Sequence, residues 1–115
     1  MVRPRTGDTT IPDDPAFDMQ VSDVEAAQRY EATIDGNLAG VIEYVVKHGR
    51  IALIHTEVLP AFEGRGVASE LIGFAIEDAR RRGLLVIPTC PFVRDYVERH
   101  PETHDIVVGW RTLPG

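Results

Sequence analysis

The sequence has one cysteine, no long apolar run and no excess of basic charge, and each shortage excludes a class of protein. A single cysteine, Cys90, cannot form an internal disulfide and has no neighbours that would complete a metal site. No apolar stretch approaches the roughly 20 residues of a membrane-spanning helix. The 12 basic residues are outnumbered by 18 acidic ones, for a net charge of −6. This balance disfavours a nucleic-acid partner, because phosphates would be repelled.

The N-terminal segment also lacks the apolar centre of a signal peptide, so we expect a cytoplasmic protein with no membrane partner. Residues 1–23 are rich in proline and aspartate and poor in large apolar side chains, and we expect a disordered tail there. The 115 residues are enough for one domain with its own core. We therefore expect a single folded domain over residues 24–115, as a monomer or weak dimer.

Three segments rich in β-branched and aromatic residues follow the tail, and they predict an antiparallel meander. They cover residues 28–34, 38–46 and 51–58. Asp35-Gly36 between the first two supplies the positive φ angles of a hairpin turn, and "KHGR" predicts a second turn. Pro60 ends the third strand, because proline cannot donate to a ladder.

From Val67 the apolar period changes to that of a helix, which extends to a left-handed cap at Gly83. "LLVIP" (84–88) predicts a short buried strand, and Pro91 fits the first position of a second helix, "PFVRDYVERH". "DIVVGW" (105–110) predicts a final edge strand. The fold class is therefore α+β, with an antiparallel meander followed by a β-α-β-α unit.

The junction between the third strand and the first helix, "PAFEGRGVAS", has the pattern of an anion site. The first N–H groups of a helix have no internal partner, and Gly64 and Gly66 would let a phosphate approach them, with Arg65 alongside. The spacing matches neither a Walker A loop nor a dinucleotide fingerprint. On spacing alone, a purely structural strand-to-helix turn explains the glycines equally well.

The stretch from His55 to Glu102, with this loop and the later "CPF" segment in order, resembles the GNAT superfamily of acyl-CoA N-acyltransferases. Within it the chain looks like a small single-domain group, over about residues 30–102. The resemblance implies a mixed sheet in which strands 51–58 and 84–88 run parallel and splay apart. It also implies acetyl-CoA as cosubstrate, no metal, and an unidentified amine acceptor.

The superfamily pattern Gln/Arg-x-x-Gly-x-Gly/Ala falls on residues 63–68, where Glu63 departs from the usual Gln or Arg. We expect this acid to point away from the pyrophosphate or to interact with Arg65. The resemblance implies that backbone around Glu57 and Val58 holds the pantetheine and the thioester carbonyl. The implied pyrophosphate cradle consists of Gly64, Arg65, Gly66, Val67, Ala68 and Ser69.

Four side chains are candidates for the chemistry. His55 and Glu57 share one face of a strand, and either could remove the amine proton, although a solvated polar face explains them as well. Cys90 lies at the expected N-cap of the second helix, which favours the thiolate, or is simply a small buried hydrophobe. The resemblance suggests that Tyr96 protonates the departing thiolate, while its apolar neighbours fit ordinary packing.

Three functions therefore stay open. The favoured one is an acetyl-CoA-dependent N-acetyltransferase that lets a primary amine attack the thioester directly in a ternary complex. The second is a CoA-binding module without catalytic activity, and the third is an interaction domain whose glycine loop is only structural. Direct attack needs only positioning and polarisation, whereas an acetyl-Cys90 intermediate would require ping-pong kinetics.

Overall fold

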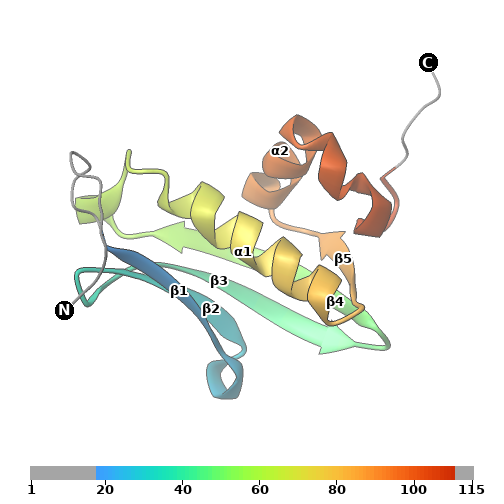
Figure 1. Cartoon of the computed structure of the whole chain (residues 1–115), viewed down its shortest axis with the longest axis horizontal. Coiled ribbons are helices and arrows are strands. Elements are labelled where there is room, and N and C mark those ends of the chain that lie inside the picture. The colour runs from blue at the N-terminus through green and yellow to red at the C-terminus, as the bar shows by residue number, and fades with distance from the viewer. Residues whose placement is uncertain (1–17, 111–115) are drawn as a thin grey trace.

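The computed structural model describes residues 18–110, which form a five-stranded sheet with two helices packed on one of its faces (Figure 1). Short 3-10 turns at Glu25–Ala27, Pro60–Phe62 and Pro101–Ile106 complete the described chain. The strands and helices are, in order, β1 (Met19–Val24), β2 (Arg29–Ile34), β3 (Asn37–Lys47), β4 (Arg50–Val58), α1 (Val67–Arg81), β5 (Leu85–Pro88) and α2 (Pro91–Arg99).

The sheet has the order β1-β2-β3-β4-β5, with four antiparallel strands and β5 parallel to β4. Both predicted turns are confirmed as two-residue loops with positive φ. Asp35 and Gly36 have φ of 52° and 82°, and His48 and Gly49 have φ of 53° and 76°. Such primed turns match the right-handed twist of the strands. The predicted α+β class with a mixed sheet is confirmed.

Two boundaries differ from the sequence prediction. Residues 19–23, assigned to the tail, belong to β1, which pairs with β2 so that Met19 and Val21 pack against the core. Residues 1–17 of the expected tail lie outside the described part. The predicted last strand is also wrong, because Pro101 starts a 3-10 turn and only Val107 makes a single bridge to Val86 of β5.

The helix face of the sheet, meaning the face that α1 and α2 cover, holds the core. The crossover from β4 through α1 to parallel β5 puts α1 on this face. α1 turns its apolar stripe toward the strands, and α2 adds Val93 and Val97. The largest fully buried side chains are Tyr30, Ile42, Ile51, Leu53, Val67, Leu71, Ile72, Ile76, Val86, Val93 and Val97.

The far end of α1 is tied to the sheet by a buried carboxylate. Asp78, 6 % exposed, accepts a hydrogen bond from the Tyr30 hydroxyl at 2.7 Å and pairs with Arg81 and Arg82. Burial, and then the bond to Asp78, raise the pKa of Tyr30. These contacts tie the C-terminal half of α1 to β2 of the sheet.

The parallel pair β4 and β5 separates halfway along β4. β5 pairs with β4 only from Arg50 to Leu53, and the last link is the Cys90 N–H donating to the Leu53 carbonyl at 3.0 Å. β4 continues for five more residues, to Val58, and among the described strands it is paired there on its β3 side only. The sheet therefore has an opening between the end of β4 and the start of α2.

A β-bulge precedes this opening and decides which side chains face it. Glu43 of β3 pairs with His55 and Tyr44 with Leu53, so Ile54 is the extra residue. After a bulge the alternation of side chains is reset. Thr56 and Val58 consequently lie on the helix face, whereas His55 and Glu57 lie on the opposite face.

Candidate active site

A cavity of about 480 Å³ lies where β4, the glycine loop and α2 meet. Thr56 and Val58 contribute from β4, and Phe92 closes the side toward α2. Of the predicted site residues, the cavity brings together Glu57, Val58, Gly64, Gly66, Val67, Ala68 and Ser69. Segments from both sides of the β4–β5 separation therefore meet in one hollow.

The glycine loop ends in an open helix N-terminus. Gly66, with φ of 77°, is the N-cap of α1 and gives no side-chain cap. The first helical bond runs from Glu70 N–H to the Gly66 carbonyl, so the N–H groups of residues 67–69 have no acceptor within the helix. Both the unpaired donors and the helix dipole favour an anion at this position.

The loop glycines are needed for backbone conformation. Gly64 and Gly66 have φ of 82° and 77°, and a Cβ added at either would meet nothing within 4 Å. A larger residue at Gly66 would therefore strain the backbone and project toward whatever occupies the cavity. The guanidinium carbon of Arg65 lies 5.6 Å from the ring centroid of Phe62.

Beyond Leu53, β4 presents unpaired backbone groups to the opening. The Leu59 N–H donates to the Ala39 carbonyl at 2.8 Å, toward β3. Hydrogen bonds alternate in direction along an antiparallel strand, so the backbone N–H groups of Val58 and Thr56 point away from β3. They face the edge that β5 has left, and a polar, extended ligand can pair with them.

His55 and Glu57 lie side by side on the sheet face opposite the helices. Nε2 of His55 is 3.6 Å from Oε1 of Glu57, and their side chains are 57 % and 61 % exposed. Glu43 of β3 is directly across from His55. Glu57 also borders the cavity, so this pair reaches the opening from the side opposite the helix N-terminus.

Cys90 occupies the N-cap of α2 and is buried, with 3 % exposure. Its side chain does not cap the helix. Sγ instead donates to Oγ1 of Thr56 at 3.3 Å. Thr56, 4 % exposed, borders the cavity, whereas Cys90 does not. The threonine therefore lies between the thiol and the cavity.

The family of the chain follows from its match over these same elements. A model of the GCN5-related N-acetyl-transferase family matches residues 29–106, from the start of β2 to the end of the last 3-10 turn. The chain belongs to this family. Among curated proteins, Protein NATD1 of Xenopus tropicalis is 30 % identical over 91 residues, covering 76 % of this chain and 83 % of the relative.

The fold agrees with a solved member of the family. The solution structure of a GCN5-like protein from Staphylococcus aureus superposes with a TM-score of 0.63 at 24 % identity, covering 82 % of this chain and 92 % of that one. The family model over residues 29–106 confirms the predicted membership of the GNAT superfamily, and this superposition confirms the fold. Its usual loop pattern is met at Gly66 and Ala68.

Glu63, where the GNAT pattern usually has Gln or Arg, borders the cavity. Arg65 lies over Phe62, and no ion pair joins it to Glu63 in residues 18–110. Of the two alternatives expected for Glu63, the interaction with Arg65 is therefore not formed within the described residues, and the other alternative, that its side chain points away from the pyrophosphate, stays a prediction. An acid at the cavity rim adds negative charge beside the open helix end.

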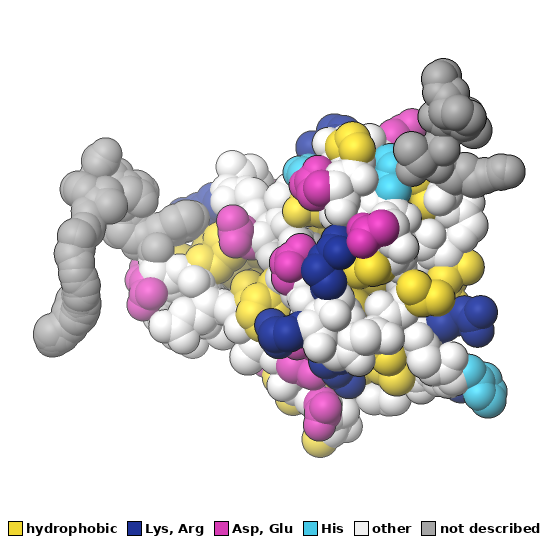
Figure 2. All heavy atoms as spheres, turned by 45° about the vertical axis from the view of Figure 1, so that its right-hand side comes forward, with side chains coloured by type: hydrophobic (Ala, Val, Ile, Leu, Met, Phe, Trp, Pro, Cys, Tyr) yellow, Lys and Arg dark blue, Asp and Glu magenta, His cyan; other side chains and the backbone are white. Residues whose placement is uncertain are grey.

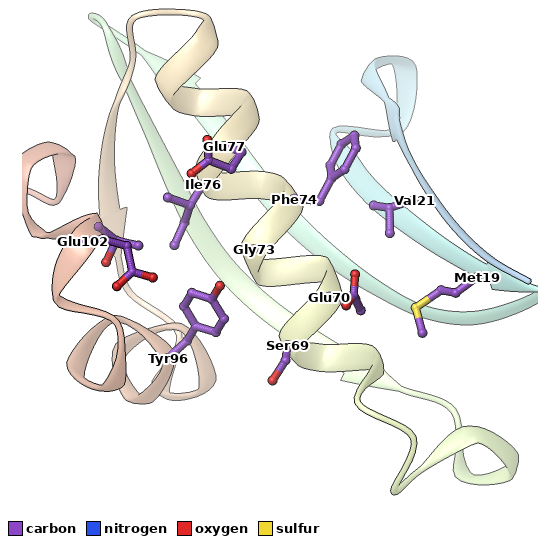
Figure 3. Close-up of a pocket in the computed structure, with 11 residues that line it drawn as sticks. Met19, Val21, Ser69, Glu70, Gly73, Phe74, Ile76, Glu77, Tyr96 and Glu102 are labelled. Atoms are coloured by element: carbon purple, nitrogen blue, oxygen red, sulfur yellow. The ribbon is translucent and has the colours of Figure 1, made fainter. Parts of the chain in front are cut away.

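Tyr96 lies in a second hollow, which adjoins the first at Ser69 (Figure 3). Its ring points toward α1, where a Cβ added at Gly73 would lie 2.9 Å from the hydroxyl, and it stacks on His100 with centroids 3.8 Å apart. Burial, then the charge of Glu102, raise the pKa of Tyr96. The structure does not bring this hydroxyl into the cavity of Thr56.

Sequence reasoning missed Thr56. The polar pair His55 and Glu57 lies on the other face of β4, and the contact of Thr56 with Cys90 spans 34 positions in the sequence.

The residues from 18 to 110 contain no group of three or more potential metal ligands and no helix long and apolar enough to span a membrane.

Proposed function

We propose that the protein is an acetyl-CoA-dependent N-acetyltransferase that lets a primary amine attack the thioester directly in a ternary complex. One observation carries the proposal: the open N-terminus of α1 and the unpaired edge of β4 border the same cavity. An acyl-CoA has an anionic pyrophosphate at one end and an amide-bearing pantetheine arm at the other. The open helix N-terminus is complementary to the pyrophosphate, and the unpaired edge of β4 is complementary to the pantetheine amides.

In this arrangement the pyrophosphate accepts hydrogen bonds from the N–H groups of Val67, Ala68 and Ser69. Arg65 lies in the same loop and adds a positive charge nearby. The pantetheine amides extend along β4 and pair with Val58, and the thioester carbonyl accepts from the Thr56 N–H. The net charge of −6 makes a local cradle of this kind necessary for binding a polyanion.

The acceptor amine approaches from the face that carries His55 and Glu57. Either group removes the amine proton through a water molecule, since their side chains are exposed and 3.6 Å apart. Glu43, opposite His55, adds a carboxylate that favours a cationic amine over an anionic acceptor. Figure 2 shows acidic and basic side chains interspersed over one side of the molecule, without a single basic patch.

Direct transfer is favoured over an acetyl-Cys90 intermediate. A nucleophilic thiol has to reach the thioester carbon, and Cys90 is 3 % exposed behind Thr56. Incubation with acetyl-CoA alone should therefore leave the intact mass of the chain unchanged while an added amine is acetylated. A thiol-labile acetyl group that forms on Cys90 and transfers at the turnover rate would overturn direct transfer.

Calorimetric titration with CoA tests the cradle, using Gly66→Val as the disruptive variant. Gly66 and Gly49 have φ of 77° and 76°, and an added Cβ at either meets nothing. Gly49→Val, in the hairpin between β3 and β4, is therefore a matched control for backbone strain. We expect Gly66→Val to weaken CoA binding by about 100-fold, because the side chain blocks the open helix end, and Gly49→Val to bind like wild type.

The same titration, followed by mass spectrometry of candidate amines after incubation with acetyl-CoA, separates the three functions. An N-acetyltransferase binds CoA and acetylates at least one amine. A binding module binds CoA and modifies none. An interaction domain binds no CoA, and equal binding by wild type and Gly66→Val would contradict the proposed cradle.

A further inference from the structure

Thr56 is a buried polar side chain with one hydrogen-bonding position still unused. Its hydroxyl oxygen accepts from Cys90 Sγ at 3.3 Å. No hydrogen bond within residues 18–110 has its own O–H as the donor. A hydroxyl has one proton to donate as well as lone pairs to accept with, so the donor of Thr56 is left over.

A leftover donor on a side chain that is 4 % exposed is costly. An unsatisfied buried donor costs about 1–3 kcal/mol, so such groups are nearly always paired or used by a ligand. Cys90 occupies the acceptor side of the hydroxyl, and the core surrounds the rest. The side that stays open is the cavity, which Thr56 borders together with Glu57 and Phe92.

We propose that the Thr56 hydroxyl donates a hydrogen bond to the sulfur of the bound acyl-CoA and stabilises the thiolate as it leaves. Cys90 is then a positioning residue: its S–H occupies the acceptor side of Thr56 and so directs the O–H toward the cavity. The inference rests on the proposed acetyl transfer. It assigns to Thr56 the stabilisation of the leaving group, because the Tyr96 hydroxyl lies against Gly73 in the neighbouring hollow.

The step balances without a further reactant. The amine nitrogen forms a bond to the acetyl carbon, the carbon–sulfur bond breaks, and its electron pair leaves on sulfur. The amine proton passes through water to His55 or Glu57, and the thiolate takes a proton from solvent after it departs. Thr56 donates a hydrogen bond to the sulfur and keeps its own proton, as a preorganised donor does where negative charge develops.

The direct test measures the ionisation of the CoA thiol in the complex, by ultraviolet absorbance against pH. Subtracting the same titration with desulfo-CoA removes the contributions of Cys90 and the tyrosines. In wild type the CoA thiol should titrate below free CoA. Thr56→Val, which keeps the shape and removes the donor, should raise that midpoint by about one to two pH units, and Thr56→Ser should restore it.

Turnover provides a second readout. Thr56→Val should lower kcat about 10- to 100-fold with the KM for acetyl-CoA within about twofold, because the bond strengthens only as charge develops on sulfur. Thr103→Val is a matched control, since Thr103 is equally buried, at 3 %, but donates to the His100 carbonyl. Thr103→Val should leave kcat, KM and the pH midpoint of the bound CoA thiol unchanged.

The outcomes are distinguishable. CoA that binds Thr56→Val as it binds wild type, with the same thiol midpoint, would overturn the role of Thr56. A Thr56→Ser variant that behaves like Thr56→Val would overturn it too, since the methyl group would then be the important part. If Thr56→Val does not fold, Thr56→Ala takes its place. Failure of wild type to bind CoA would instead overturn the proposed function.

Discussion

Cys90 shows how a contact distant in sequence changes the interpretation of a single residue. Its place at a helix N-terminus suggested a thiolate held by the helix dipole. The side chain instead turns sideways to Thr56, and it is buried. At this scale the sequence identifies which residues are chemically capable, while the fold decides which of them can reach a ligand.

Burial predicts that Cys90 reacts slowly. Alkylation by iodoacetamide has to wait for a local opening of the chain, so the native rate should be about tenfold or more below that of the unfolded chain in urea. Cys90 is the only cysteine, so intact mass reports this reaction without interference. Equal rates in native and unfolded protein would show that the thiol is accessible after all.

The two helices and the turns were predictable because their signals are local. The apolar repeat from Val67 predicts α1, Pro91 predicts the start of α2, and Asp35-Gly36 predicts a hairpin. β1 was missed because its apolar and polar residues alternate only from Met19 to Ser22, and its pairing partner β2 determines the strand. The segment 105–110 was misassigned because apolar content alone does not distinguish a strand from a packed turn.

The site was also predictable only in part, because only some of its features are encoded by local sequence patterns. The glycine loop is a contiguous motif, and the structure gives it the open helix end that the motif suggested. The Thr56–Cys90 contact needs β4 and the start of α2 to be adjacent, and no local pattern encodes that. Tyr96 fits a family role by its place in the sequence, but its ring packs on Gly73.

The packing of α2 on α1 depends on a glycine at position 73. A Cβ there would lie 2.9 Å from the Tyr96 hydroxyl, closer than such atoms approach. Gly73→Ala should therefore destabilise the protein by about 1–2 kcal/mol, because overpacking outweighs the roughly 1 kcal/mol gain in helix propensity. Urea unfolding measures the change.

Removing the Tyr96 hydroxyl should turn the destabilisation by Gly73→Ala into a stabilisation. In a Tyr96→Phe background the nearest remaining ring atom is 3.7 Å from the added Cβ, an ordinary contact. Gly73→Ala should then stabilise the protein by up to about 1 kcal/mol through helix propensity alone. The same destabilisation in both backgrounds would refute the clash.

Over the whole molecule, two tyrosine–carboxylate hydrogen bonds respond to alkali, one between β2 and α1 and one between β3 and β1. Tyr30 donates to Asp78, and Tyr44 donates to Asp23 at 2.6 Å. Burial first, and then these bonds, raise the pKa of both tyrosines above the ordinary value of about 10. Each tyrosine thus keeps its proton in the folded chain at a pH where the unfolded chain has lost it.

The raised pKa values of Tyr30 and Tyr44 make the folded protein less stable in alkali. The stabilisation is fully present below pH about 10, and it is lost as the pH rises above that value, by about 1.4 kcal/mol per pH unit for each tyrosine. Urea midpoints on both sides of pH 10 measure this slope. Tyr44→Phe removes one group and should make the slope shallower, and an unchanged slope would show that Tyr44 does not contribute.

Within residues 18–110, the separation of β4 from β5 gives the sheet a third edge. An open sheet ordinarily has two, here the outer sides of β1 and β5, but β4 beyond Leu53 adds an internal one. Bare edges are templates for strand addition. A pantetheine arm with amides spaced along a chain would act there as a short surrogate strand. Binding of the cosubstrate would then also complete the sheet, and it would keep the loaded protein from pairing with extended chains.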